Sequence, residues 1–151
     1  MRFQQREYTC GPAAIVNAAR ALGVRVAERR VAKLASTAKN HETDDWQMLE
    51  AIRGVGLIAE PLLAESRSAA WAFVKSSLSS GRPVIVCIDS YSHWTTLIGV
   101  CGDRVLMADP IRTDTNKKEN GIISLGRLEL LRRWMHKSKG EHYGIAVGRK
   151  R

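Results

Sequence analysis

The stretch Pro83-Val84-Ile85-Val86-Cys87-Ile88 decides the fold class, because it is a short and uninterrupted apolar run. Such a run is typical of a strand that is buried on both faces. Trp94–Cys101 and Val105–Ala108 follow as two further strands, and Gly102-Asp103 between them is a strong hairpin signal. Two more segments have strand character: Gly121–Leu125 and Tyr143–Val147. The second half of the chain therefore predicts an antiparallel sheet.

Upstream of this run the apolar residues follow a helical period. Cys10–Leu22 is rich in alanine and is followed by Gly23, a residue that commonly ends helices. Further helices are predicted over Ala27–Ala35, after an N-cap at Thr43, after Ser66 or Ser68, and over Arg127–Met135. N-terminal helices packed on a C-terminal antiparallel sheet form an α+β arrangement. A length of 151 residues suits a single domain that spans residues 1–151.

Several broad classes are excluded by composition. No segment approaches the ~20 apolar residues of a transmembrane helix, and Met1–Glu7 lacks the apolar core of a secretory signal. The sequence therefore predicts a cytoplasmic protein. Its three cysteines, Cys10, Cys87 and Cys101, are odd in number and widely spaced, which fits neither a disulfide framework nor a zinc site. We expect free thiols and no metal or organic cofactor.

The formal net charge of +9 is unevenly distributed. The segment Arg127–Arg151 carries eight lysines or arginines against Glu129 and Glu141. A basic surface of this kind attracts an acidic partner, nucleic acid or an anionic membrane, although it also serves simply as a solvated surface. No basic helix interleaved with aromatic residues and no zinc-finger spacing supports sequence-specific DNA recognition.

Cys10 is the first candidate for catalysis, because it stands where the first predicted helix begins, in Thr9-Cys10-Gly11-Pro12. A helix N-terminus and a neighbouring histidine both stabilise a thiolate, which is the nucleophilic form of cysteine. Gly11 and Pro12 would start the helix tightly and leave the thiol facing the surface. A cysteine in this position is more often structural, so the assignment depends on its companions.

His93 and Asp109 are the companions. His93 leads an apolar strand, where a ring on a rigid element can serve as a general base. Asp109 ends the neighbouring strand just before Pro110, so its carboxylate can orient the second ring nitrogen of His93. Asp89 is a rival carboxylate that also ends a strand. The other histidines, which are weaker candidates, are His41, His136 and His142.

Attack of a thiol on an amide builds negative charge on the carbonyl oxygen, and preorganised hydrogen-bond donors must meet that charge. A glutamine shortly before the nucleophile can supply its side-chain N–H beside the backbone N–H of Cys10. Gln4 lies six positions before Cys10 and Gln5 lies five before it. Neither glutamine means much by itself.

Taken together, Gln4, Cys10-Gly11, His93 and Asp109-Pro110 resemble the bacteriocin-processing (double-glycine leader) cysteine peptidase family. The resemblance covers the whole chain and implies a papain-like fold. It implies Cys10 as nucleophile, His93 as base, Asp109 as its orienting group and Gln4 in the oxyanion hole. It also implies that Cys87 and Cys101 belong to the core. Because the sequence contains neither membrane helices nor a phosphate-binding loop, it resembles the stand-alone members of the family.

Three functions remain open from the sequence. The first is a cysteine peptidase, a hydrolase that acts on a peptide or protein through a thioester, with leader-peptide processing as one form. The second is a non-catalytic module that binds a peptide, an acidic partner or nucleic acid through Arg127–Arg151. The third is amide hydrolysis or acyl transfer on a non-peptide substrate, since that chemistry is identical up to the final acceptor.

Overall fold

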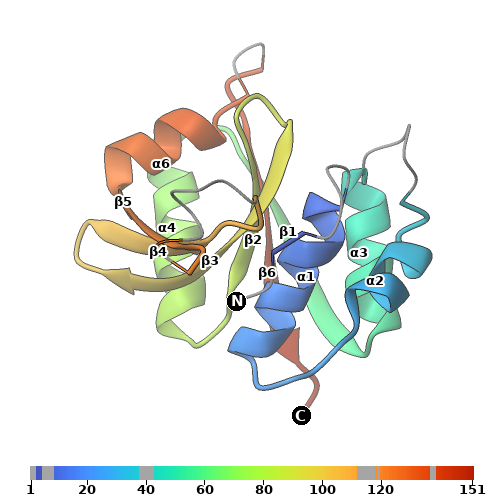
Figure 1. Ribbon diagram of the computed structural model, residues 1–151. Helices are drawn as coiled ribbons and strands as arrows, with labels where there is room; N and C mark the ends of the chain where they lie inside the picture. The colour runs from blue at the N-terminus through green and yellow to red at the C-terminus, as the bar shows by residue number, and fades with distance from the viewer. Residues whose placement is uncertain (1–2, 5–8, 38–42, 112–117, 119, 137–138) are drawn as a thin grey trace.

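A six-stranded antiparallel sheet forms the centre of the molecule (Figure 1). The structure is a computed structural model that describes residues 3–4, 9–37, 43–111, 118, 120–136 and 139–151. The strand order is β1-β6-β2-β3-β4-β5. The strands are β1 (Leu57–Ala64), β2 (Val84–Ile88), β3 (His93–Cys101), β4 (Arg104–Ala108), β5 (Ile122–Gly126) and β6 (His142–Arg149). The predicted α+β class is confirmed.

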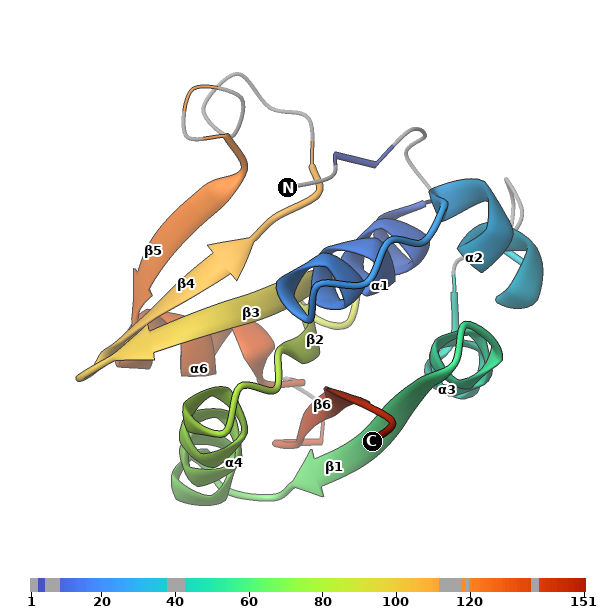
Figure 2. The ribbon, with the colours of Figure 1, turned by 90° about the horizontal axis from the view of Figure 1, so that it is seen from below.

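Helices cover both faces of the sheet (Figure 2). On one face lie α1 (Cys10–Ala21), α2 (Glu28–Leu34) and α3 (Asp45–Gly54); on the other lie α4 (Arg67–Ser79) and α6 (Arg127–Trp134). Side chains of β2 point alternately to the two layers, so that Ile85 and Cys87 join the first core and Val84, Val86 and Ile88 join the second. All five residues are buried, which confirms the expectation for this run.

The first half of the chain departs from the sequence prediction at β1. Sequence analysis predicts no strand between the third and fourth helices, yet Leu57–Ala64 pairs with β6 over its whole length. The strand contains Pro61, which lacks a backbone N–H and is tolerated because β1 lies at the edge of the sheet. The burial of its side chains does not alternate regularly, and this irregularity hides the strand in the sequence.

The start of α3 also differs from the prediction, because Asp44 and not Thr43 is its N-cap. The backbone N–H of Asp44 donates to Oε1 of Gln47 over 2.8 Å, which is one half of a capping box. Thr43 is thereby placed just before the helix, where it contacts the beginning of α1. In α4 the N-cap is Ser66, one of the two predicted positions, and its hydroxyl accepts the N–H of Ala69. Within the described ranges, every helix is too short or too polar to cross a membrane.

Candidate active site

His93 and Asp109 meet at the ends of β3 and β4. The Nε2 atom of His93 lies 2.7 Å from Oδ1 of Asp109, and both residues are buried, with 6% and 5% of their surface exposed. The same carboxylate oxygen accepts the backbone N–H of Ile111 over 3.0 Å. Because two donors hold this carboxylate, it fixes the orientation of the imidazole ring. The predicted pairing of these two residues is therefore present in the structure.

Cys10 begins α1 and lies close enough to His93 to be one of the groups that raise the pKa of its ring. Since Asp109 engages Nε2 of the ring, Nδ1 is left for the thiol. Burial lowers the pKa of His93, but the hydrogen bonds to Asp109 and Cys10 and their negative charges outweigh it and raise that pKa to about 9. The three side chains thus favour a protonated imidazolium between a thiol and a carboxylate. Contrary to the expectation of a surface-facing thiol, Cys10 is only 8% exposed.

Asp89 is not the partner of His93. Its carboxylate accepts two hydrogen bonds from Arg133 of α6, from Nε over 3.0 Å and from Nη2 over 2.9 Å. These bonds hold the pKa of Asp89 below its usual range. The backbone N–H of Asp89 also donates to the carbonyl of Arg133 over 2.7 Å. Through these contacts with Arg133, Asp89 holds the β2–β3 turn against α6.

This turn carries His93 and is unusual in its backbone. Asp89, Ser90 and Tyr91 have φ angles of 54°, 62° and 61°, so three consecutive non-glycine residues lie in the left-handed region. The hydroxyl of Ser92 closes the turn by donating to the carbonyl of Asp89 over 2.7 Å. A turn of this kind persists only when its surroundings hold it, and the Arg133 contacts supply that support.

Gln4 lies beside the same site. Its backbone N–H donates to the carbonyl of Pro110 over 2.9 Å, directly after Asp109, and its side-chain oxygen is buried. The backbone N–H of Cys10, at the start of α1, belongs to the first turn, whose donors have no intrahelical acceptor. Gln4 is thus fastened next to the residues that follow β4. The alternative residue, Gln5, lies outside the described residues, as does His41.

The other described cysteines and histidines do not belong to the Cys10–His93–Asp109 group. Cys87 is buried in the core as expected, but the expectation for Cys101 is wrong, because it is exposed at the end of β3. His136 lies against Tyr91, with ring centroids 4.6 Å apart, and His142 is buried against Trp134. No group of three or more His, Cys, Asp or Glu residues in the described ranges is placed to hold a metal ion.

Because Gly11 has no side chain, the start of α1 can pack closely against the residues that precede α3. A Cβ atom at this position would lie 2.9 Å from Cβ and Oγ1 of Thr43 and 3.0 Å from Sδ of the buried Met48. Such distances are shorter than van der Waals contact, so a side chain at position 11 would displace the helix start that carries Cys10.

We expect Gly11→Ala to lower the free energy of unfolding by about 1–3 kcal/mol, the usual cost of overpacking a core. Chemical denaturation measures this change. Gly99→Ala is the matched control, because its new Cβ would meet only Leu106 side-chain atoms, at 3.5 Å or more. If both variants unfold at the wild-type denaturant concentration, the packing of Gly11 is not restrictive.

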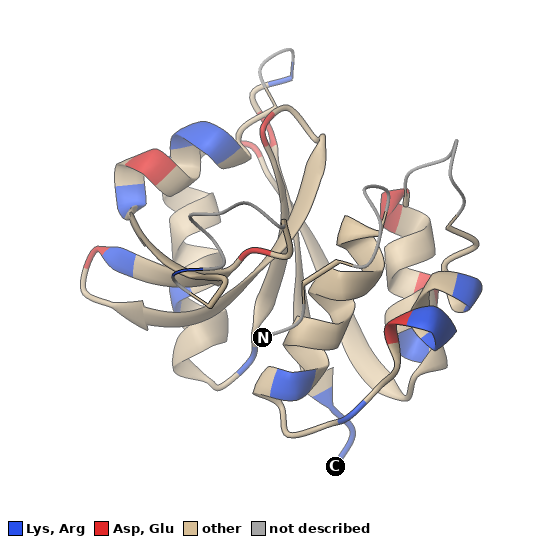
Figure 3. Cartoon of the chain, in the orientation of Figure 1, with Lys and Arg blue, Asp and Glu red and all other residues tan. Residues whose placement is uncertain are grey.

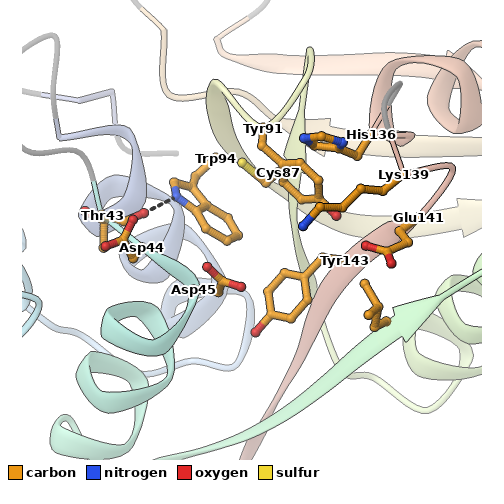
Figure 4. A pocket seen from close by; sticks show the side chains of 11 residues that line it. Thr43, Asp44, Asp45, Cys87, Tyr91, Trp94, His136, Lys139, Glu141 and Tyr143 are labelled. Atoms are coloured by element: carbon orange, nitrogen blue, oxygen red, sulfur yellow. Dashed lines mark hydrogen bonds between the residues drawn. The ribbon is translucent and has the colours of Figure 1, made fainter.

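A pocket of about 410 Å³ opens beside this site (Figure 4). Its walls come from the start of α3, the β2–β3 turn and the region around the start of β6, and we call it the Trp94 pocket. The indole N–H of Trp94 donates to the carbonyl of Thr43 over 2.8 Å and so joins two of its walls. Its lining residues are Thr43, Asp44, Asp45, Leu63, Cys87, Tyr91, Trp94, His136, Lys139, Glu141 and Tyr143.

Residues 1–140 match the family described as the Peptidase_C39 like family. The chain belongs to this family. The match includes Cys10, His93 and Asp109, and it confirms the resemblance inferred from the sequence. A protein of Methanothermobacter thermautotrophicus, described only as uncharacterized, is 30% identical over 108 residues, which are 72% of this chain and 69% of that protein.

Solved structures agree with this assignment at the level of the fold. The peptidase domain of Streptococcus ComA, a bifunctional ABC transporter involved in a quorum-sensing pathway, superposes with a TM-score of 0.73 and 15% identity, over 99% of this chain and 97% of that domain. A double-glycine-motif protease from an AMS/PCAT transporter, solved with its leader peptide, gives a TM-score of 0.67 and 15% identity over 98% and 89%. The fold of this Peptidase_C39-like chain is therefore that of C39 peptidase domains.

Proposed function

We propose that this protein is a cysteine peptidase that hydrolyses peptide bonds with Cys10 as nucleophile, His93 as acid and base, and Asp109 as the group that orients His93. The observation that carries the proposal is the buried, hydrogen-bonded pair His93–Asp109, with Cys10 beside it at the start of α1. Membership of a peptidase family supports the same chemistry. A structural relative solved with a leader peptide supports a peptide as substrate, with leader processing as one form.

The mechanism follows from the positions of these groups. The Cys10 thiolate attacks the carbonyl carbon of the substrate, and the charge on the resulting oxyanion is met by the Cys10 backbone N–H and the Gln4 side chain. His93 gives its proton to the leaving amine, which releases the first product and leaves a thioester. His93 then takes a proton from water, whose oxygen attacks the thioester carbon. The carbon–sulfur bond breaks, which releases the acid product and restores the Cys10 thiolate beside the protonated His93. Every step uses groups of this chain, of the substrate and of water.

A non-catalytic module that binds through Arg127–Arg151 is the alternative. Figure 3 shows that the basic residues of α6 and those of the C-terminus lie at different ends of the molecule. Arg133 is paired with Asp89, and the guanidinium of Arg127 lies 5.3 Å from the Trp71 ring centroid. Since the described basic residues of this segment are not gathered at one end of the molecule, the peptidase is the better-supported function.

The direct test is digestion of a mixed peptide library by the full chain, with products identified by mass spectrometry. We expect cleavage products that accumulate with time and are absent after alkylation of the protein. Salt-sensitive binding of DNA, RNA or anionic vesicles without any products would contradict the proposal and favour the binding module. Products from non-peptide amides or esters alone would assign the same site to the third function.

Arg133 offers a separate prediction as a positioning residue. We expect Arg133→Gln to lower kcat by about tenfold with little change in KM, because the turn that carries His93 loses its support while the substrate contacts remain. Arg132→Gln is the matched control, since Arg132 is its exposed neighbour on α6. Asp89→Asn should give the same defect, and adding it to Arg133→Gln should cost little more. Equal kcat values for the Arg132 and Arg133 variants would contradict this role.

A further inference from the structure

Two walls of the Trp94 pocket adjoin the segments that carry the reacting side chains. Trp94 directly follows His93, and Thr43 on the opposite wall packs against Gly11, which directly follows Cys10. An extended chain advances about 3.3–3.6 Å per residue. A peptide whose carbonyl lies at the Cys10 sulfur would therefore place a side chain one or two positions away in this pocket.

Aromatic rings form much of the wall. Trp94 and Tyr143 meet edge to face, with centroids 6.3 Å apart and planes at 76°. The indole N–H is already donated to Thr43, so Trp94 offers its ring and not a donor. Burial, with nearby negative charge, raises the pKa of Tyr91 and that of Tyr143 to about 12, so both phenols stay neutral. Neutral aromatic rings of this kind attract a cation.

Two carboxylates complete the pocket. In Figure 4, Asp45 points from the start of α3 into the space between Trp94 and Tyr143, and Glu141 faces it from the other side. Within the described part of the chain, neither the Asp45 nor the Glu141 carboxylate makes a hydrogen bond or an ion pair. Asp44, in contrast, is occupied in capping α3. The pocket therefore offers two negatively charged hydrogen-bond acceptors among aromatic walls.

Among the described residues that line the pocket, Lys139 is the one lysine or arginine. Its side chain extends over the opening towards Tyr91 in Figure 4. Among the described residues it forms no ion pair with Asp45 or Glu141, so it leaves both carboxylates available. Its positive charge opposes the entry of a cationic ligand side chain and weakens the binding of that side chain. Because Asp45 and Glu141 together outweigh one lysine, the pocket still attracts a cation.

We propose that the Trp94 pocket is a specificity subsite for a basic side chain, lysine or arginine, of the peptide substrate. The basic residue lies within two positions of the bond that is cleaved. Its aliphatic stem lies along Trp94 and Tyr143, and its charged end meets Asp45. This inference rests on the proposed peptidase function and adds a substrate class to it.

A positional-scanning peptide library tests the subsite. Each position in turn is fixed as Lys, Arg, norleucine, Gln or Glu, and kcat/KM is measured with the full chain. At one position near the cleaved bond we expect Lys and Arg to exceed norleucine by about tenfold, as an ion pair combined with a cation–π contact allows. Asp45→Asn should abolish that preference, and Lys139→Gln should increase it. The control Glu50→Gln, an exposed carboxylate on the same helix, should retain wild-type rates.

Binding to Cys10→Ala separates failure of the subsite from failure of the peptidase. Calorimetry should show tighter binding of the Lys peptide than of the norleucine peptide, and Asp45→Asn should remove the difference. Preferential binding without cleavage in the wild type would support the subsite and overturn the proposed function. Cleavage with no preference for Lys or Arg, or a preference for Glu that Lys139→Gln removes, would overturn the subsite and leave the peptidase in place.

Discussion

Replacing Cys10 by alanine is expected to abolish peptide turnover while the protein stays folded. Alanine keeps the Cβ atom and removes one buried sulfur, so the N-terminal turn of α1 and the packing of Gly11 on Thr43 are retained. The acyl-enzyme cannot form without the sulfur, and loss of a nucleophile lowers turnover by about 10⁶-fold in comparable hydrolases. The product assay on the peptide library, followed over days, measures the loss.

Cys87→Ala and Cys101→Ala are the controls for this experiment. Cys101 is exposed at the end of β3, and its substitution should leave both turnover and stability unchanged. Cys87 is buried in the core and lines the Trp94 pocket, so its substitution should cost stability. A Cys10→Ala protein that turns over peptides at more than a few per cent of the wild-type rate would show that another group performs the attack.

The second large effect concerns Asp109 and the pH dependence of turnover. The reactive form requires a protonated His93, whose pKa is raised to about 9. Activity should therefore fall as the pH rises through about 9. By the same linkage, the interaction of His93 with its partners stabilises the folded state fully below the ordinary histidine pKa of 6.5, and this stabilisation is lost as the pH passes 9. The pH profile of kcat/KM measures this fall in activity, which is the upper limb of the profile.

Asp109→Ala should lower kcat by about 10²–10⁴-fold, because the ring loses the acceptor that orients it. It should also move the upper limb to lower pH, since the carboxylate is one cause of the raised pKa of His93. Asp109→Asn should be much less damaging than Asp109→Ala. An imidazolium donates from both ring nitrogens, and the amide oxygen of asparagine accepts such a bond, as it does in papain-like Cys-His-Asn sites. Equal activity of all three proteins would exclude an orienting role.

The pairing of His93 with Asp109 was predictable from the sequence because His93 begins one strand of a hairpin and Asp109 directly follows the other. A hairpin turn such as Gly102-Asp103 fixes which strands are adjacent, so lateral contact follows from local signals alone. Cys10 was recognisable from the helix that begins there. Its low exposure was not, because that depends on how closely Gly11 approaches Thr43 and Met48.

Other features depend on contacts between segments far apart in the chain. Asp89 is bound by Arg133, which lies 44 positions later in the chain, and no local sequence pattern links the two residues. The Trp94 pocket combines Asp45, Trp94 and Tyr143, which meet only because β6 enters the sheet beside β2. Cys101 has an apolar local sequence, but it faces solvent because it stands at the last position of its strand.

Alkylation of the three free cysteines at pH 6, followed by peptide mapping, tests the central claim most directly. Iodoacetamide reacts with thiolates, so a thiolate held by the His93 imidazolium should make Cys10 the fastest of the three despite its low exposure. His93→Ala should slow labelling of Cys10 while labelling of the exposed Cys101 stays unchanged. Labelling of Cys10 that is slower than that of Cys101 in the wild type, and indifferent to His93→Ala, would contradict the account.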